Sequence, residues 1–192
     1  MLCVLVSLLY ACSPRHISSK FYYENEQTID LIEKSYKAQH QKREFAIAFT
    51  NKKFRTLSFE IITDSMTYIY EYDLDDTAMG PMLAKYNLDV KEVIGLAKLM
   101  KLIRCTWVNN FDYYINEKKH SLTFISIRPV ALNEPFTYKE YYILTYFNQP
   151  QAFDESGRLL TGREARKLHR INGEIFHRIN DKVCYTVSAR FR

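Results

Sequence analysis

The sequence contains little glycine, proline or cysteine. Its 192 residues include 5 Gly, 5 Pro and 4 Cys. So few Gly and Pro exclude a collagen-like or low-complexity chain, and four Cys are too few for a small scaffold held by disulfides. Neither a phosphate-binding loop nor a dinucleotide-binding fingerprint is present, because both need glycines at fixed spacing. A Gly-x-Ser-x-Gly nucleophile elbow is also missing.

Long hydrophobic runs are missing as well. The apolar run from Leu2 to Tyr10 is far shorter than the ~20 residues that a membrane-spanning helix needs. Apolar residues make up 47% of the chain and charged residues 26%, with a formal net charge of +5. These values exclude a disordered polyanion and a multi-span membrane protein. The length predicts one globular domain with a sizeable core.

The N-terminus has the pattern of an export signal. The segment from Met1 to Ala11 is uncharged, and its apolar run has the length of a signal-peptide core. The run ends in Leu9-Tyr10-Ala11-Cys12, followed by Ser13. This pattern resembles the lipobox of bacterial lipoproteins, in which a small residue precedes a cysteine that receives the lipid. Two alternatives stay open: a buried first strand of a soluble protein, and plain secretion.

The lipoprotein resemblance implies a cellular location and the limits of the signal peptide, the tether and the domain. Residues 1–11 would be the signal peptide, Cys12 the lipid anchor, residues 12–23 a tether, and residues 24–192 a single domain. Ser13 after the lipidated cysteine implies an outer-membrane lipoprotein in the bacterial cell envelope, facing the periplasm. In that oxidising compartment Cys105 and Cys184 could form a disulfide, or remain two buried thiols.

The periodicity of the domain predicts an α+β fold with an antiparallel sheet. We expect an N-terminal helix over residues 24–43 and a long apolar helix from Val90 to Arg104, with Asp89 in a capping-box position. Residues 45–49 could extend the first helix or begin a strand. A short basic helix is expected over residues 161–170. The expected strands are residues 56–62 and 66–72 as a hairpin, then 106–115, 121–130, 138–147 and 182–192.

Few residues suggest catalysis or a cofactor. Glu71, Asp73, Asp75 and Asp76 superficially resemble a calcium loop, but the Gly and Glu that such a loop requires are missing. The five histidines, at positions 16, 40, 120, 169 and 177, lack the spacing of zinc ligands. We therefore expect no metal, no cofactor and no enzymatic activity. The alternative is an envelope hydrolase in which an aspartate of the acidic group meets His120, His169 or His177.

Two features instead suggest partner binding. Tyr68, Tyr70 and Tyr72 share one face of a predicted strand, and tyrosine supplies rigid amphipathic contact area. The short basic helix carries a cluster of positive charge, formed by Arg163, Arg166, Lys167 and Arg170. The sequence predicts a binding, assembly or protective module whose partner is an envelope protein or an anionic envelope polymer. An envelope address argues against nucleic acid, and the remaining alternative is a cytoplasmic basic protein that contacts it.

Overall fold

The computed structural model describes residues 14–115, 117–127, 141–151 and 176–188. Cys12 and its lipobox, the predicted basic helix and its four basic residues lie outside this part of the chain. The described residues form three helices and eight strands. The elements are α2 Pro14–His40, β1 Phe45–Phe49, β2 Thr56–Ile62, β3 Thr67–Asp73, α3 Met79–Lys85, α4 Val90–Leu102, β4 Cys105–Ile115, β5 Lys118–Ile127, β6 Tyr141–Phe147, β7 His177–Arg178 and β8 Val183–Ser188.

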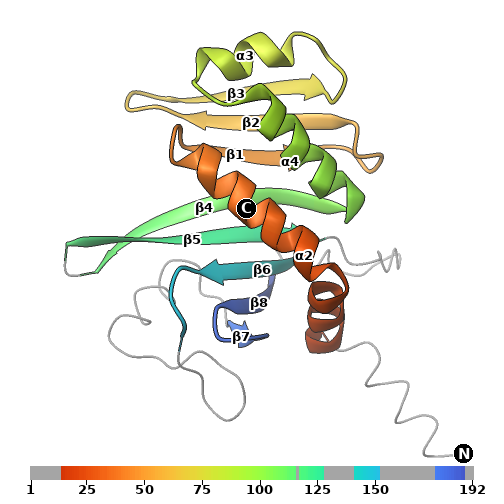
Figure 1. The fold of residues 1–192 in the computed structure, drawn as a ribbon, viewed down its shortest axis with the longest axis vertical. Coiled ribbons are helices and arrows are strands. Elements are labelled where there is room, and N and C mark those ends of the chain that lie inside the picture. Colours follow the sequence, from red (N-terminus) through yellow and green to blue (C-terminus); the bar gives the residue numbers. More distant parts are fainter. Residues whose placement is uncertain (1–13, 116, 128–140, 152–175, 189–192) are drawn as a thin grey trace, which may run out of the picture. The chain divides into compact units, whose positions relative to one another are not determined.

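The strands form one antiparallel sheet in the order β3-β2-β1-β4-β5-β6-β8-β7 (Figure 1). The α+β class predicted from the sequence is therefore confirmed. The chain also divides into two compact units. One comprises residues 1–26, 112–122 and 128–192, and the other residues 27–111 and 123–127.

The core of the second unit lies where helices cover β1 and β2. In Figure 1 α4 crosses β2 and β1, and the later part of α2 crosses the same face over β1 and β4. Ile47 of β1 and Phe59 of β2 are register partners and are almost fully buried. From α2, Ile29, Ile32 and Tyr36 are fully buried at helical spacing, and each buried isoleucine contributes about 1.5–3 kcal/mol. Phe45–Phe49, which the sequence leaves ambiguous, is the strand β1.

The helix α4 begins where the capping pattern predicts. The Asp89 carboxylate accepts hydrogen bonds from the backbone N–H groups of Lys91 (2.9 Å) and Glu92 (3.1 Å). These bonds satisfy two N–H groups that have no partner inside the helix. The helix ends at Leu102, not at Arg104 as predicted, because Arg104 has a φ of 59° and the chain there leaves the helical conformation.

The first helix is longer than its periodicity predicts. Periodicity places its start at residue 24, but α2 begins at Pro14. Residues 14–23, expected as part of a tether, are therefore helical, and Ser18 and Tyr22 are buried.

The other unit contains β6 and β8, which pair over Tyr141–Tyr146 and Val183–Ser188. Near them, Asn180 accepts hydrogen bonds from the N–H groups of Lys182 (2.9 Å) and Val183 (2.8 Å) and donates one to the Tyr22 hydroxyl (3.1 Å). The first half of α2 is thus bonded to the turn before β8. Two short elements, α3 and β7, are not predicted by the sequence patterns.

Candidate binding surface on the edge strand β3

Among the strands that the structure describes, β3 lies at one end of the sheet order and pairs with β2 alone. Every side chain from Thr67 to Asp73 is exposed or half-exposed. Ile69 keeps 67% of its surface exposed and Tyr68 keeps 36%, while Met66, just before the strand, keeps 54%. An edge strand with exposed apolar side chains is a surface on which another chain can dock.

The three tyrosines predicted to share a face form a stacked row. The Tyr68 and Tyr70 ring centroids lie 6.3 Å apart at 21°, and those of Tyr70 and Tyr72 lie 6.4 Å apart at 14°. In register they oppose Ile61, Phe59 and Leu57 of β2. The tyrosine row therefore lies on the same face of the sheet as the core and extends that face toward the open edge.

Tyr86 holds this tyrosine row in place, although the sequence patterns do not single it out. Tyr86, just after α3, contacts both Tyr68 and Tyr70, and its hydroxyl oxygen lies 2.6 Å from that of Tyr70. The Lys85 ammonium lies 5.3 Å from the centroid of the Tyr86 ring. Tyr86 stands in a stretch without clear periodicity, so only its position after a helix in the fold reveals its role. We call Thr67–Asp73 together with Tyr86 the edge surface.

The direction of the backbone groups of β3 follows from two hydrogen bonds at its ends. The N–H of Leu74 donates to the Arg55 carbonyl (2.7 Å), and the N–H of Thr63 donates to the Met66 carbonyl (3.0 Å). In an antiparallel ladder, residues alternate between bonding to one neighbour and pointing to the other side. The even-numbered residues of β3 therefore bond to β2. The N–H groups of Thr67, Ile69 and Glu71 are directed to the open edge.

The same odd-numbered residues carry the charge of the strand. Glu71 and Asp73 are both exposed, and they share a face with Ile69. The Asp73 carboxylate accepts a hydrogen bond from the Thr56 hydroxyl (2.8 Å). Within the described residues, neither carboxylate forms an ion pair with a Lys, Arg or His side chain. One face of the strand is thus tyrosine-rich, and the other combines an exposed isoleucine with two carboxylates.

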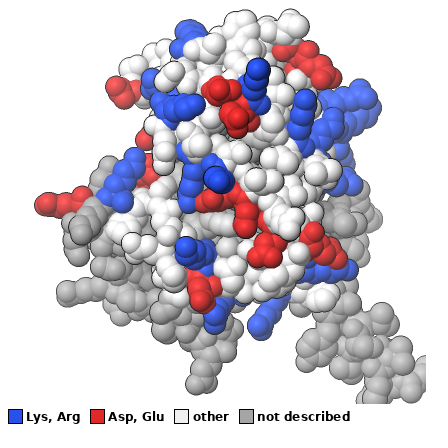
Figure 2. Space-filling model, in the orientation of Figure 1, with Lys and Arg blue, Asp and Glu red and all other residues white. Residues whose placement is uncertain are grey.

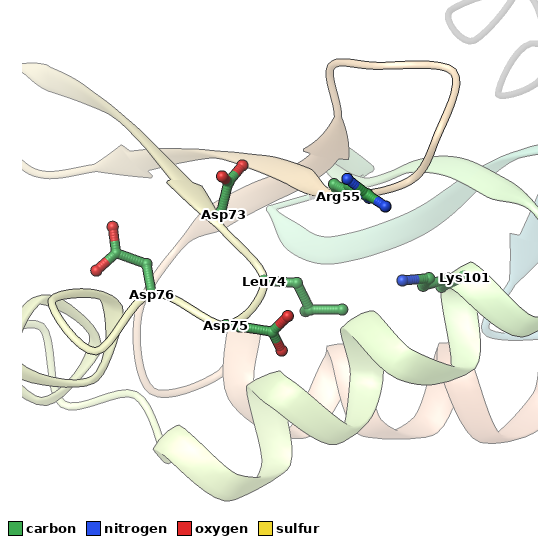
Figure 3. Close-up of a pocket in the computed structure, with 6 residues that line it drawn as sticks. All are labelled: Arg55, Asp73, Leu74, Asp75, Asp76 and Lys101. Carbon is green, nitrogen blue, oxygen red and sulfur yellow. The ribbon is translucent and has the colours of Figure 1, made fainter.

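A polar hollow of about 590 Å³ lies where β3 ends. Figure 3 shows three carboxylates on one side of it and two cationic side chains on the other. Leu74 stands between the two groups, which are Asp73, Asp75 and Asp76 on one side and Arg55 and Lys101 on the other. Among the described residues no ion pair joins these groups, and all five charged side chains are exposed.

The hydrolase alternative needs a histidine beside these aspartates. No histidine is among the described residues that line the hollow. His120 and His177 lie on β5 and β7 in the other unit, and His169 lies outside the described residues. The part of the chain that the structure describes also contains no group of three or more His, Cys, Asp and Glu able to hold a metal ion.

The two cysteines of the domain are buried as free thiols. Cys105 lies at the start of β4 and Cys184 on β8, and β5 and β6 stand between these strands in the sheet order. Burial raises the pKa of Cys105 to about 12, and burial also raises the pKa of Cys184. Both thiols therefore remain protonated and unreactive at neutral pH.

The charge of the visible surface is mixed. Figure 2 shows Lys and Arg side chains interspersed with Asp and Glu over the described part of the face that carries the helices. Nucleic-acid binding requires positive charge gathered on one face, and this part of the surface does not supply it. None of the described helices combines the length and hydropathy that crossing a membrane requires.

Comparison with protein-family models, with curated proteins and with solved structures gives no match. The candidate site therefore stands on its own geometry.

Proposed function

We propose that this chain is a non-enzymatic binding module that captures a protein partner on the edge surface. The observation that carries the proposal is the exposure of β3 at the end of the sheet, with Tyr68, Ile69 and Met66 open to solvent. Natural proteins usually protect an edge strand with charged side chains, lysine above all, with proline or with a bulge. The seven residues of β3 contain neither lysine nor proline, their two charges are both acidic, and their register with β2 is uninterrupted.

The tyrosine row suits such a surface. Tyrosine loses little conformational freedom on binding and offers both an apolar ring and a hydroxyl. The stacking of Tyr68, Tyr70 and Tyr72, together with the hydroxyl contact of Tyr86, holds the rings in place before a partner arrives. A preorganised surface avoids part of the ordering cost of binding.

The proposal also includes the cellular location that the N-terminal sequence implies. Its support is the apolar run Leu2–Tyr10 followed by Ala11-Cys12-Ser13. Lipidation of Cys12 would anchor the chain to the bacterial outer membrane, facing the periplasm. Labelling of cells with a radioactive fatty acid tests it: wild type should carry label and Cys12→Ala should not. An unlabelled wild type, or a labelled Cys12→Ala variant, overturns the anchor.

Site-specific photo-crosslinking in cells tests the binding surface. A photoreactive phenylalanine analogue replaces Tyr68 in the full-length chain, and irradiation should produce one discrete higher-mass adduct with a partner protein. The matched control places the same analogue at Leu31 of α2, which is 51% exposed and distant from β3 in sequence. The edge surface is refuted if both positions give the same adducts or if Tyr68 gives none.

The basic residues predicted to contact a partner remain part of the proposal. Removing the positive charge of Arg163, Arg166, Lys167 and Arg170 together should weaken partner binding and reduce its dependence on salt. Unchanged binding at low salt would remove this segment from the partner surface and leave the edge surface as the candidate.

A further inference from the structure

The open edge of β3 is built to receive another strand. Thr67, Ile69 and Glu71 direct their N–H groups away from β2, and within the described residues these groups have no hydrogen-bond partner. At the opposite end of the sheet order, β7 contains only two residues. A row of unpaired backbone groups along seven residues is a template for β-strand addition. We infer that the partner binds by adding an extended, basic segment alongside β3.

The charge of β3 selects the chemistry of that segment. Side chains on an added strand lie opposite those of β3, about 4.5–5.5 Å away. Positive side chains on the segment would meet Glu71 and Asp73, both exposed and without an ion pair among the described residues. On the other face, apolar side chains would pack against Tyr68, Tyr70 and Tyr72. The expected segment therefore alternates basic and apolar residues.

A second copy of β3 fits the edge less well. Antiparallel pairing of two β3 strands would place Glu71 and Asp73 of both copies on one face of the seam. In the register that overlaps all seven residues, Glu71 of one copy lies opposite Ile69 of the other and diagonal to its Glu71. Four carboxylates gathered on one face of the seam repel one another and find no positive charge there. The acidic residues thus disfavour self-pairing and favour a basic partner, so one feature serves both purposes.

A direct test uses two peptides and the full-length chain in detergent. The first is the blocked peptide acetyl-Lys-Val-Lys-Val-Lys-Val-Lys-amide, and the second has glutamate in place of each lysine. Fluorescence anisotropy should show that the lysine peptide binds and that the glutamate peptide does not. The double variant Glu71→Lys with Asp73→Lys should weaken binding of the lysine peptide by about three- to tenfold and strengthen binding of the glutamate peptide. Equal binding of the two peptides to wild type overturns the charge assignment.

A backbone variant separates strand addition from simple charge attraction. Ile69→Pro removes one N–H that faces the open edge and leaves the ladder with β2 intact, because proline is tolerated where the N–H points to solvent. Ile69→Thr is the matched control, since it changes the same side chain and keeps the N–H. The lysine peptide should bind at least about tenfold more weakly to Ile69→Pro than to Ile69→Thr, with equal melting temperatures for the two variants. Equal affinities overturn strand addition.

The inference rests on the proposed function, and its failure can be distinguished from failure of that function. If Ile69→Pro retains both peptide affinity and the Tyr68 crosslink, the edge surface binds its partner by side chains alone and the inference is wrong. If the chain that carries the photoreactive analogue at Tyr68, and no other change, gives no crosslink, the proposed function itself is wrong. Sedimentation gives the remaining arm: a wild-type dimer that Ile69→Pro converts to a monomer would show that a second copy occupies the edge, which also overturns a basic partner.

Discussion

The hydroxyl oxygens of Tyr70 and Tyr86 lie 2.6 Å apart, which joins the edge strand β3 to the residue that follows α3. This hydrogen bond is the main cause of a raised pKa at Tyr70, with desolvation as the next cause. The contact holds the middle of the tyrosine row against a second element. The edge surface is therefore fixed from the side as well as from β2.

Removal of the Tyr86 hydroxyl should release Tyr70. In Tyr86→Phe the pKa of Tyr70 should fall toward its usual 10.0, because the group that opposes its ionisation is lost. NMR titration of ring-labelled tyrosine measures this. Tyr72→Phe is the control, since Tyr72 stacks on Tyr70 while the hydroxyl contact comes from Tyr86. A Tyr70 pKa that moves equally in both variants contradicts the assignment.

The cap of α4 should contribute stability that depends on pH. The backbone N–H of Glu92, followed by that of Lys91, holds the pKa of Asp89 below its usual 3.8. A carboxylate with a lowered folded pKa stabilises the fold above its unfolded pKa, and this contribution is lost as the pH falls through the folded pKa. Asp89→Ala should lower the melting temperature by roughly 2–4 °C at pH 7. The difference from wild type should shrink below pH 3.8.

A second cap variant separates charge from hydrogen bonding. Asp89→Asn keeps an acceptor at the N-cap and loses the titrating group. Its melting temperature should lie close to that of wild type at pH 7, with a difference from Asp89→Ala that does not change between pH 3 and pH 7. If Asp89→Asn proves no more stable than Asp89→Ala, the cap does not act through its hydrogen bonds.

The buried thiols should make the fold sensitive to alkali. Unfolded cysteine ionises from a pKa near 9.0, whereas burial raises the pKa of Cys105 to about 12. A raised folded pKa means that the stabilisation is complete below pH 9 and is lost as the pH rises toward 12. For Cys105 the loss at pH 10 is about 1 kcal/mol. Urea unfolding of wild type and Cys105→Ala at pH 8 and pH 10 measures it as the change in their stability difference. A difference that stays constant contradicts the prediction.

The two faces of the hairpin should respond differently to truncation. Phe59 of β2 is fully buried, so Phe59→Ala should cost about 3–5 kcal/mol in the free energy of unfolding. Ile69 of β3 is 67% exposed, so Ile69→Ala should change stability by no more than about 0.5 kcal/mol. Chemical denaturation compares them. A large loss in Ile69→Ala would mean that this side chain is buried by something other than the described residues.

Local patterns in the sequence predict which helices and strands form better than they predict the residues at which these elements begin and end. The alternation across residues 56–72 predicts the hairpin of β2 and β3, and Asp89 with Glu92 predicts the start of α4. Periodicity places the start of α2 too late, because Ser18 and Tyr22 become buried only through tertiary packing. A seven-residue helix such as α3, which contains Gly80 and Pro81, has a local sequence typical of a turn. Tertiary packing decides whether such a segment becomes helical, and the periodicity of the sequence does not reveal that packing.

The candidate site is predictable in part. The alternation of residues 66–72 places Tyr68, Tyr70 and Tyr72 on one face. It does not show that β3 is the last strand of the sheet, which follows from sheet order and not from any local pattern. The sequence also points to Ile69, because it is an apolar residue on a face of the strand whose other residues are polar. The contribution of Tyr86 requires the fold, because it lies 16 residues from Tyr70.

The unequal ends of the sheet set a limit on stoichiometry. One terminal strand, β3, has seven residues and the other, β7, has two. Among the described strands, the longer terminal row of backbone groups lies beside β3, and once an added strand is in place that row is occupied. A chain of this kind should form complexes of one partner per copy instead of growing into a filament.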